Sequence, residues 1–280
     1  MAIVNVTPDS FSEAEPVVSP AAAIARCERL LGEGADILDI GGESTRPGAP
    51  SIDAATELAR VRPVLQAAVR LGCPVSIDTT KAEVMRAALD LGADIVNDIA
   101  ALRGPASLDV VAAHGRCGVC LMHMRGAPAT MEEEAHYGDV VAEVAAFLRE
   151  RVAAVQAAGV ARERIVVDPG IGFAKTPAHN LALLARQQEL ASLGAPLLVG
   201  WSRKSTLARL AGVATPARER SADERARIVA ASVAAAVLAV ERGARIVRVH
   251  DVAATVAALA LWRAARADNH ADLSSARATP

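Results

Sequence analysis

Polar residues that could do chemistry recur along this chain, each at or just after the end of a short apolar run. Carboxylates and amides can exchange hydrogen bonds with a ligand, transfer protons or bind a metal ion, and lysine and histidine side chains can hold a proton beside an anion. The apolar runs are rich in Val and Ile and are flanked by Gly or Pro, as buried parallel strands usually are. The polar residues are Asn5, Asp39, Asp78, Asn97, His123, Asp168, Lys204 and His250.

The spacing of the apolar runs predicts the elements that position these residues. Eight runs alternate with stretches that carry apolar residues at helical spacing. Eight β-α units in 280 residues predict an α/β fold, a single closed (β/α)8 (TIM) barrel, which typically takes about 250 residues. Because strand C-termini and their loops build the active site of such a barrel, the polar residues should converge on one mouth of an enzyme. The expected strands are 2–6, 36–40, 75–78, 94–98, 119–123, 165–168, 197–202 and 246–250.

The chain is expected to form one domain. We expect the barrel over residues 1–267, with a short or missing lead-in before the first strand, and a disordered polar tail over 268–280. The longest nearly unbroken apolar run, 228–240, is shorter than the roughly 20 residues that span a membrane. A net charge of −2 offers no basic surface for nucleic acid. No secretory signal precedes the first strand, so we expect a cytoplasmic protein.

Cysteine and lysine usage adds two observations. The four cysteines include a CxxC pair, Cys117 and Cys120, but one pair without further ligands favours core packing over zinc or redox chemistry. Only three of the 30 basic residues are lysines, and each of them, Lys81, Lys175 and Lys204, follows an expected strand. A compact ammonium is not equivalent to a planar guanidinium, so Lys204 in particular is a candidate ligand-binding residue.

The first two loops carry groups suited to phosphate. Asn5 offers a neutral oxygen that could ligate a magnesium ion shared with substrate phosphates, or could hydrogen-bond the loop backbone instead. The paired glycines of segment 39–48 could form an anion-binding nest, to which Thr45 and Arg46 add a hydroxyl and a guanidinium. The alternative for this segment is a plain surface turn.

Asp78, Asn97 and Asp168, two acids and an amide, end the third, fourth and sixth expected strands, respectively. Around one mouth they could bind a metal, act as acid and base, or hold the donor-rich edge of a heterocycle; they could also merely cap the following helices. Asp98 should point to the other side of its strand. Phe173, in a glycine-rich loop after Asp168, is a candidate stacking surface, with ordinary loop packing as the alternative.

The end of the chain places a cation beneath an imidazole. Arg248 and His250 share one side of the eighth strand, so His250 at the mouth puts Arg248 just below it. A buried arginine is costly unless an anion or an acid pairs with it. Because the loops after strands seven and eight are the usual phosphate site of this fold, a phosphorylated ligand is one explanation. A structural pair with Asp39 or Asp251 is the other.

Eight motifs then follow one another in a recognisable order. They are NVTPDSFS from residue 5, DIGGESTRPG from residue 39, SIDT from residue 76, NDI from residue 97, LMHMRG from residue 121, DPGIGFAK from residue 168, SRKS from residue 202 and RVHDV from residue 248. In this order they resemble the dihydropteroate synthase family, and the resemblance covers residues 2–266, nearly the whole chain.

The resemblance implies a transferase of folate biosynthesis. It would condense 6-hydroxymethyl-7,8-dihydropterin pyrophosphate with p-aminobenzoate, use Mg²⁺, and act as a homodimer in the cytoplasm. The same resemblance implies a catalytic group of Asp168, Lys204, His250 and Arg46. It assigns the pterin to Asp78, Asn97, Asp168 and Lys204, the diphosphate to Thr45, Arg248 and His250, magnesium to Asn5, and the aminobenzoate to Phe173, Ser205, Arg46 and Pro47.

The chain departs from the family pattern in its first loop, where Glu13, Ala14 and Glu15 replace Asp-Gly-Gly. Glycines change φ and ψ at least cost, so we expect slower loop closure and lower turnover with normal pterin affinity. Trp201 stands where the family has a smaller residue, and Ala231–Ser232 stands where it has Gly-Ser or Gly-Thr. The competing functions are a pterin-binding paralogue with weak or no synthase activity, a pterin-dependent methyltransferase, and a Schiff-base aldolase that uses Lys204.

Overall fold

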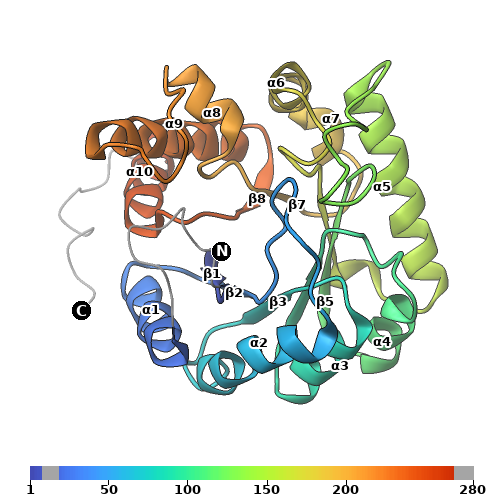
Figure 1. Cartoon of the computed structure of the whole chain (residues 1–280). Coiled ribbons are helices and arrows are strands. Elements are labelled where there is room, and N and C mark those ends of the chain that lie inside the picture. Colours follow the sequence, from blue (N-terminus) through green and yellow to red (C-terminus); the bar gives the residue numbers. More distant parts are fainter. Residues whose placement is uncertain (8–18, 268–280) are drawn as a thin grey trace.

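The strands form one closed parallel sheet. The computed structural model describes residues 1–7 and 19–267, and within them eight parallel strands pair in sequence order. A bridge between Ala2 and Val249 joins the last strand back to the first. The predicted single (β/α)8 barrel is therefore confirmed (Figure 1). The strands are β1 (Ala2–Asn5), β2 (Leu38–Gly41), β3 (Val75–Asp78), β4 (Ile95–Asp98), β5 (Gly118–Met122), β6 (Ile165–Asp168), β7 (Leu197–Val199) and β8 (Ala244–Val247).

Helices surround this sheet (Figure 1). Several begin at residues whose side chains cap them: Asp53 and Asp139 accept backbone N–H groups, and Thr176 and Ser221 form capping boxes. Each such cap stabilises its helix by about 1 kcal/mol, so the loops before these helices end at defined points. The helices are α1 (Pro20–Gly32), α2 (Ala54–Ala68), α3 (Ala82–Asp90), α4 (Ser107–His114), α5 (Val140–Ala157), α6 (Pro177–Ala185), α7 (Gln187–Ala191), α8 (Ser205–Leu210), α9 (Ala222–Glu241) and α10 (Val252–Arg266), with a 3-10 turn at Arg162–Arg164.

Apolar side chains fill the space between the sheet and the helices, and a smaller cluster that includes Met1, Cys120 and Leu198 is also buried. Cys117 and Cys120 are both buried free thiols, so the prediction of core packing for the CxxC pair is confirmed. Among the described residues, no helix is both long enough and apolar enough to cross a membrane.

The predicted bounds of the last two strands were wrong. β7 ends at Val199 instead of residue 202, and β8 covers Ala244–Val247 instead of 246–250. The register shifts between Leu197 and Leu198, and the chain leaves the sheet at Gly200. Arg248 and His250 therefore lie just beyond β8. Two other expectations, the altered loop at residues 13–15 and the polar tail at 268–280, lie outside the described residues.

Candidate active site

A cavity of about 710 Å³ opens at the carboxyl ends of the strands. The residues that the family resemblance assigned to ligands or catalysis line it, although they come from seven different strand ends or the loops that follow them. Convergence on one mouth is therefore confirmed for this set. Its members are Asn5, Thr45, Arg46, Pro47, Asp78, Asn97, Asp168, Phe173, Lys204, Ser205, Arg248 and His250.

Arg248 joins two acids in the cavity floor. Its Nε lies 2.5 Å from Asp39 Oδ2 and its Nη2 lies 2.6 Å from Asp78 Oδ2. Asn97 Nδ2 donates to the same Asp39 oxygen at 3.1 Å. Arg248 thus forms the structural ion pair that the sequence analysis gave as one explanation, with Asp39 as a partner. Asp251, the other candidate partner, pairs with Arg203 instead.

Asp39 was predicted at the mouth, and this prediction was wrong. Its side chain is fully buried beneath the cavity, where Arg248 and Asn97 cover it. The guanidinium of Arg248 therefore forms ion pairs with two carboxylates, those of Asp39 and Asp78. Burial raises the pKa of Asp78 to about 7, and the nearby Asp39 charge adds to this shift while Arg248 opposes it. The floor consequently holds a carboxyl group that can carry a proton near neutral pH.

Asp168, Lys204 and Phe173 form one wall. Burial raises the pKa of the Asp168 carboxyl, whose Oδ1 accepts the Gly170 N–H at 2.7 Å. Burial also lowers the pKa of Lys204 to about 8, and Arg248 adds to that shift. The Lys204 ammonium lies 4.2 Å from the centre of the Phe173 ring, so the predicted aromatic surface is already in contact with a cation. This wall can bind a ligand that offers both donors and acceptors.

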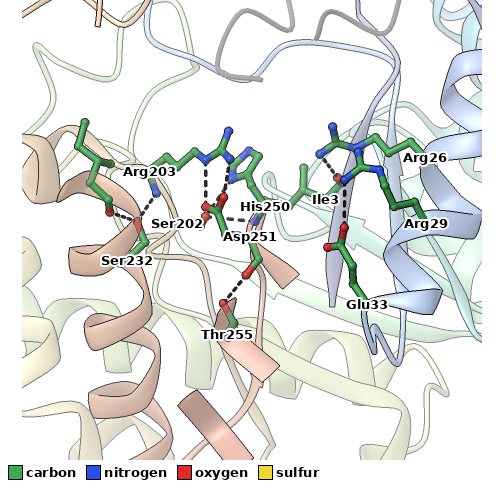
Figure 2. A network of polar contacts seen from close by, with 11 residues as sticks. Ile3, Arg26, Arg29, Glu33, Ser202, Arg203, Ser232, His250, Asp251 and Thr255 are labelled. Atoms are coloured by element: carbon green, nitrogen blue, oxygen red, sulfur yellow. Dashed lines mark hydrogen bonds and ion pairs between the residues drawn. The ribbon is translucent and has the colours of Figure 1, made fainter. Parts of the chain in front are cut away.

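His250 is held in place by Ser202 in the loop after β7. Ser202 Oγ accepts the backbone N–H of His250 at 3.1 Å and lies 3.0 Å from His250 Nδ1 (Figure 2). A Ser202 hydroxyl that donates to Nδ1 would leave the ring proton on Nε2. Burial lowers the pKa of His250 well below its ordinary value, and Arg203 and Arg248 add to this. His250 is therefore a neutral hydrogen-bond donor at pH 7.

The same loop is clamped to the start of α10. Arg203 binds Asp251 through two contacts, at 3.0 and 2.5 Å, as Figure 2 shows. Arg203 has a φ of +58°, which is unfavourable for a residue with a Cβ, and its N–H donates to Ser232 Oγ at 3.0 Å. Ser232, one half of the departure Ala231–Ser232, thus helps to hold the turn that presents Lys204.

One further predicted mouth residue, one lysine and one acid lie outside the cavity. His123 does not line the cavity; it is buried beside Lys175, with their Nδ1 and Nζ atoms 2.9 Å apart. Lys81 forms ion pairs of 2.7 Å with Glu43 and Glu57. Asp98 points away from the mouth as predicted, and it accepts the backbone N–H groups of Ala100 and Leu102.

Other lining residues were missed from the sequence. Several of them lie away from the strand ends: Met131 and Glu132 follow β5 at a distance, and an arginine-rich segment lies between α8 and the first turn of α9. The only sequence signal for the latter was a concentration of arginines after the seventh strand. The arginines concerned are Arg218, Arg220 and Arg225.

Replacing Gly170 with alanine should distort the loop after β6. A Cβ on Gly170, whose φ is +67°, would lie 2.0 Å from the carbonyl oxygen of His123. Gly212 has a φ of +68° with no atom within 4 Å of its Cβ position, so Gly212→Ala measures backbone strain alone, about 1–2 kcal/mol. Gly170→Ala should cost about 1–3 kcal/mol more in free energy of unfolding, measured by urea denaturation. Equal losses would show that the His123 backbone yields freely.

Comparison with known proteins identifies the class of this barrel. The model of the pterin binding enzyme family matches residues 1–250, most of the chain. The dihydropteroate synthase of Neisseria meningitidis serogroup B is 50% identical over 269 residues, which cover 94% of this chain and 91% of that protein. The dihydropteroate synthase of Escherichia coli K12 is 45% identical, with 92% and 88% covered.

Solved structures agree. The Xanthomonas albilineans dihydropteroate synthase with 4-aminobenzoic acid is 49% identical, with a TM-score of 0.85 over 96% of this chain and 93% of that chain. The Burkholderia cenocepacia dihydropteroate synthase complexed with 7,8-dihydropteroate is 51% identical, with a TM-score of 0.83 over 95% and 91%. The fold and the cavity are thus those of a pterin-binding enzyme. Within that class, the chain belongs to the dihydropteroate synthase family.

Proposed function

We propose that this cavity condenses 6-hydroxymethyl-7,8-dihydropterin pyrophosphate with p-aminobenzoate to give 7,8-dihydropteroate and pyrophosphate, as a transferase of folate biosynthesis. One observation carries the proposal: a single cavity is lined by two different groups of side chains. One group is the acids, amide and lysine of Asp78, Asn97, Asp168 and Lys204, and the other is the hydroxyl, guanidinium and imidazole of Thr45, Arg248 and His250. Structures of relatives with 4-aminobenzoic acid and with 7,8-dihydropteroate support the two ligand classes.

The pterin is assigned to the acid and amide side. Asp78, Asn97 and Asp168 can accept hydrogen bonds from the amino and ring N–H groups of a pterin, and Lys204 can donate to its acceptor atoms. Burial raises the pKa of both Asp78 and Asp168, whereas N–H groups of a donor-rich ligand would favour their ionised forms. Phe173, Ser205, Arg46 and Pro47 are left to receive the arylamine and its carboxylate.

The diphosphate is assigned to Thr45, Arg248 and His250, with magnesium at Asn5. The donor set fits an ion that arrives with the substrate, because Asn5 supplies one neutral oxygen. Strand β1 lies next to the chain that leaves β8 and carries Arg248 and His250. Mg²⁺ usually takes one or two protein oxygens and completes its shell with phosphate oxygens and water. When bound, it would offset the negative charge of the leaving diphosphate.

The reaction replaces one bond by another at the pterin methylene carbon. The arylamine nitrogen forms a bond to this carbon, the carbon–oxygen bond to the diphosphate breaks, and the amine loses a proton. Positive charge develops on the methylene carbon and negative charge on the departing oxygen. The Asp168 carboxylate stabilises the first charge, and the Nε2–H of His250 donates to the second.

A pyrophosphate-release assay with both substrates tests the proposal. Release should require the pterin ester and p-aminobenzoate together, because the ester carbon needs the amine as its nucleophile. Pterin binding without release would favour the inactive paralogue, and borohydride trapping of Lys204 with a carbonyl substrate would favour the aldolase. Methyl transfer from a pterin would favour the methyltransferase.

Replacing His250 with alanine should separate the diphosphate from the pterin. The variant should bind the pyrophosphate ester more weakly by about 1.5–3 kcal/mol, the range for a hydrogen bond to a charged group. Its affinity for the bare hydroxymethyl pterin should change little, because the imidazole is not assigned to the ring. Calorimetry with both ligands measures this difference, and equal losses would mean that His250 only shapes the cavity.

A homodimer in the cytoplasm is the proposed state of the protein. Small apolar residues on α9 and α10 line one groove, and such a face packs well against a second copy. Four free thiols are compatible with a reducing compartment. Sedimentation equilibrium should give twice the chain mass, and a monomer at all concentrations would refute the dimer. The groove residues are Ala226, Val229, Ala230, Val233, Ala234, Val237, Leu238, Ala254 and Ala258.

A further inference from the structure

Scarce aromatic residues gather around one buried lysine beside the cavity. The chain has only three Phe, one Tyr and two Trp. Tyr137 lies with its ring centre 6.0 Å from Lys175 Nζ, and Phe147 meets the ring of His123, the partner of Lys175, edge-on at 4.9 Å. Phe173 supplies a backbone carbonyl to the same ammonium. The placement of these rings around Lys175 has no part in the functions assigned above.

Lys175 is bound on every side by neutral acceptors. Its side chain is 8% exposed, and its Nζ lies 2.9 Å from His123 Nδ1, 3.3 Å from His123 O and 2.9 Å from Phe173 O. Burial lowers the pKa of His123 far below neutrality, so its ring can accept. Burial lowers the pKa of Lys175 to about 7, so its protonated form directs three N–H groups toward these three acceptors. Within residues 1–7 and 19–267 no carboxylate forms an ion pair with this lysine.

The loop that carries Phe173 does not hold its shape by local preference. Gly170, Gly172 and Ala174 have φ values of +67°, +78° and +50°, and the last is unfavourable for alanine by about 1 kcal/mol. Asp168 binds the Gly170 N–H, and Asn180 binds the Gly172 N–H at 2.9 Å. These contacts fix the first half of the loop.

Lys175 fixes the second half by tying it to another strand. Its ammonium bridges the carbonyl of Phe173 and the backbone of His123, the residue that directly follows β5. The ring of Phe173 meanwhile lines the cavity against Lys204. A shift of the Phe173 backbone would therefore move the wall that faces the proposed arylamine site.

We propose that Lys175 is a positioning residue for the arylamine acceptor: its ammonium ties the Phe173 backbone to the end of β5 and so sets the wall against which the aromatic amine binds. This inference rests on the proposed function. An arginine does not substitute, because a planar fork cannot direct three N–H groups from one nitrogen toward three acceptors. The need for three N–H groups on one nitrogen gives a physical reason why residue 175 is a lysine in a chain whose basic residues are mostly arginines.

The test compares Lys175→Met with Arg164→Met. Arg164 also binds backbone carbonyls, of Cys117 at 2.7 Å and Val111 at 3.2 Å, but it precedes β6 and so lies at the opposite end of the barrel. Lys175→Met should raise KM for p-aminobenzoate about tenfold, the equivalent of one hydrogen bond to a charged group. Its Kd for the pterin ester, measured by calorimetry, should stay within about twofold. Arg164→Met should leave both values unchanged.

A second pair of variants keeps the inference testable if Lys175→Met does not fold. His123→Asn replaces the Nδ1 acceptor with an amide oxygen that can accept from Lys175, whereas His123→Leu leaves no side-chain acceptor. Only the leucine variant should raise KM for p-aminobenzoate. An unchanged KM in Lys175→Met and His123→Leu, or a parallel loss of pterin affinity, would overturn the inference. A wild-type protein that releases no pyrophosphate in the same assay would instead overturn the proposed function.

Discussion

Replacing Arg248 with methionine is expected to destabilise the barrel by about 3–5 kcal/mol, the cost of removing one partner from a buried ion pair. The guanidinium is the shared partner of Asp39 and Asp78, and Asp39 is fully buried. Without it, two carboxylates would face each other in the cavity floor with no cation between them. Urea denaturation at pH 8 measures the loss, and Arg245→Met, an equal change of charge at an exposed position of β8, should stay within about 0.5 kcal/mol of the wild type.

The pH dependence of this variant has a definite sign. A carboxyl whose pKa in the folded state exceeds its unfolded value is destabilising when ionised, so its penalty is complete above the folded pKa and fades as the pH falls. The pKa of Asp78 is already raised to about 7 with Arg248 in place. The deficit of Arg248→Met should therefore shrink between pH 7 and pH 4, and Asp39→Asn with Asp78→Asn in the same chain should recover most of it. A deficit below about 1 kcal/mol at pH 8 would contradict the structural role.

Replacing Lys204 with arginine should lower kcat/KM at least about 100-fold, or roughly 2.7 kcal/mol, although the charge is kept. The lysine stem passes so close to Gly172 that a Cβ there would lie 3.1 Å from Lys204 Cδ, and the ammonium sits on the Phe173 ring. A guanidinium has no room in this contact and would project past the pterin atoms. The value of kcat/KM from steady-state kinetics and the pterin affinity from calorimetry should fall together. Wild-type pterin affinity in Lys204→Arg would remove this lysine from the pterin site.

Lys81→Arg is the matched control, because Lys81 binds two carboxylates, which suit a guanidinium fork. It should retain activity within about threefold. The pH profile gives a second readout: burial lowers the pKa of Lys204 to about 8, so the ammonium is lost as the pH rises through 8. Pterin affinity should fall above that pH in the wild type and show no such fall in Lys204→Met.

The barrel could be predicted because its elements repeat one local pattern. Each buried strand is a short run of apolar residues, and the polar residue that ends it must appear at the carboxyl end of the sheet. That rule placed Asn5, Asp78, Asn97 and Asp168 correctly with no knowledge of their neighbours. The same rule failed at Asp39 and His123. Both lie at strand ends, but each is buried against a basic side chain. Arg248 forms an ion pair with Asp39, and Lys175 contacts the ring of His123.

What the sequence could not supply was the pairing across the barrel. Arg248 was a buried cation with two candidate partners, and only the closure of β8 onto β1 shows that Asp39 and Asp78 face it while Asp251 faces Arg203. The arginines of the segment after α8 were missed for a related reason. Arg218 and Arg220 lie in the loop between α8 and α9, and Arg225 lies in the first turn of α9. This loop packs against α9 through Val213 and Ile228, a contact that no local repeat in the sequence indicates.

The positions of the lysines have a practical consequence for amine chemistry. Lys81, Lys175 and Lys204 are the only lysines of the chain, and all three lie at the carboxyl end of the barrel and are buried or half-buried. Amine-reactive dyes, crosslinkers and coupled resins therefore find no lysine on the helical exterior. Any label that such reagents do attach to a lysine will report on the region of the active site alone.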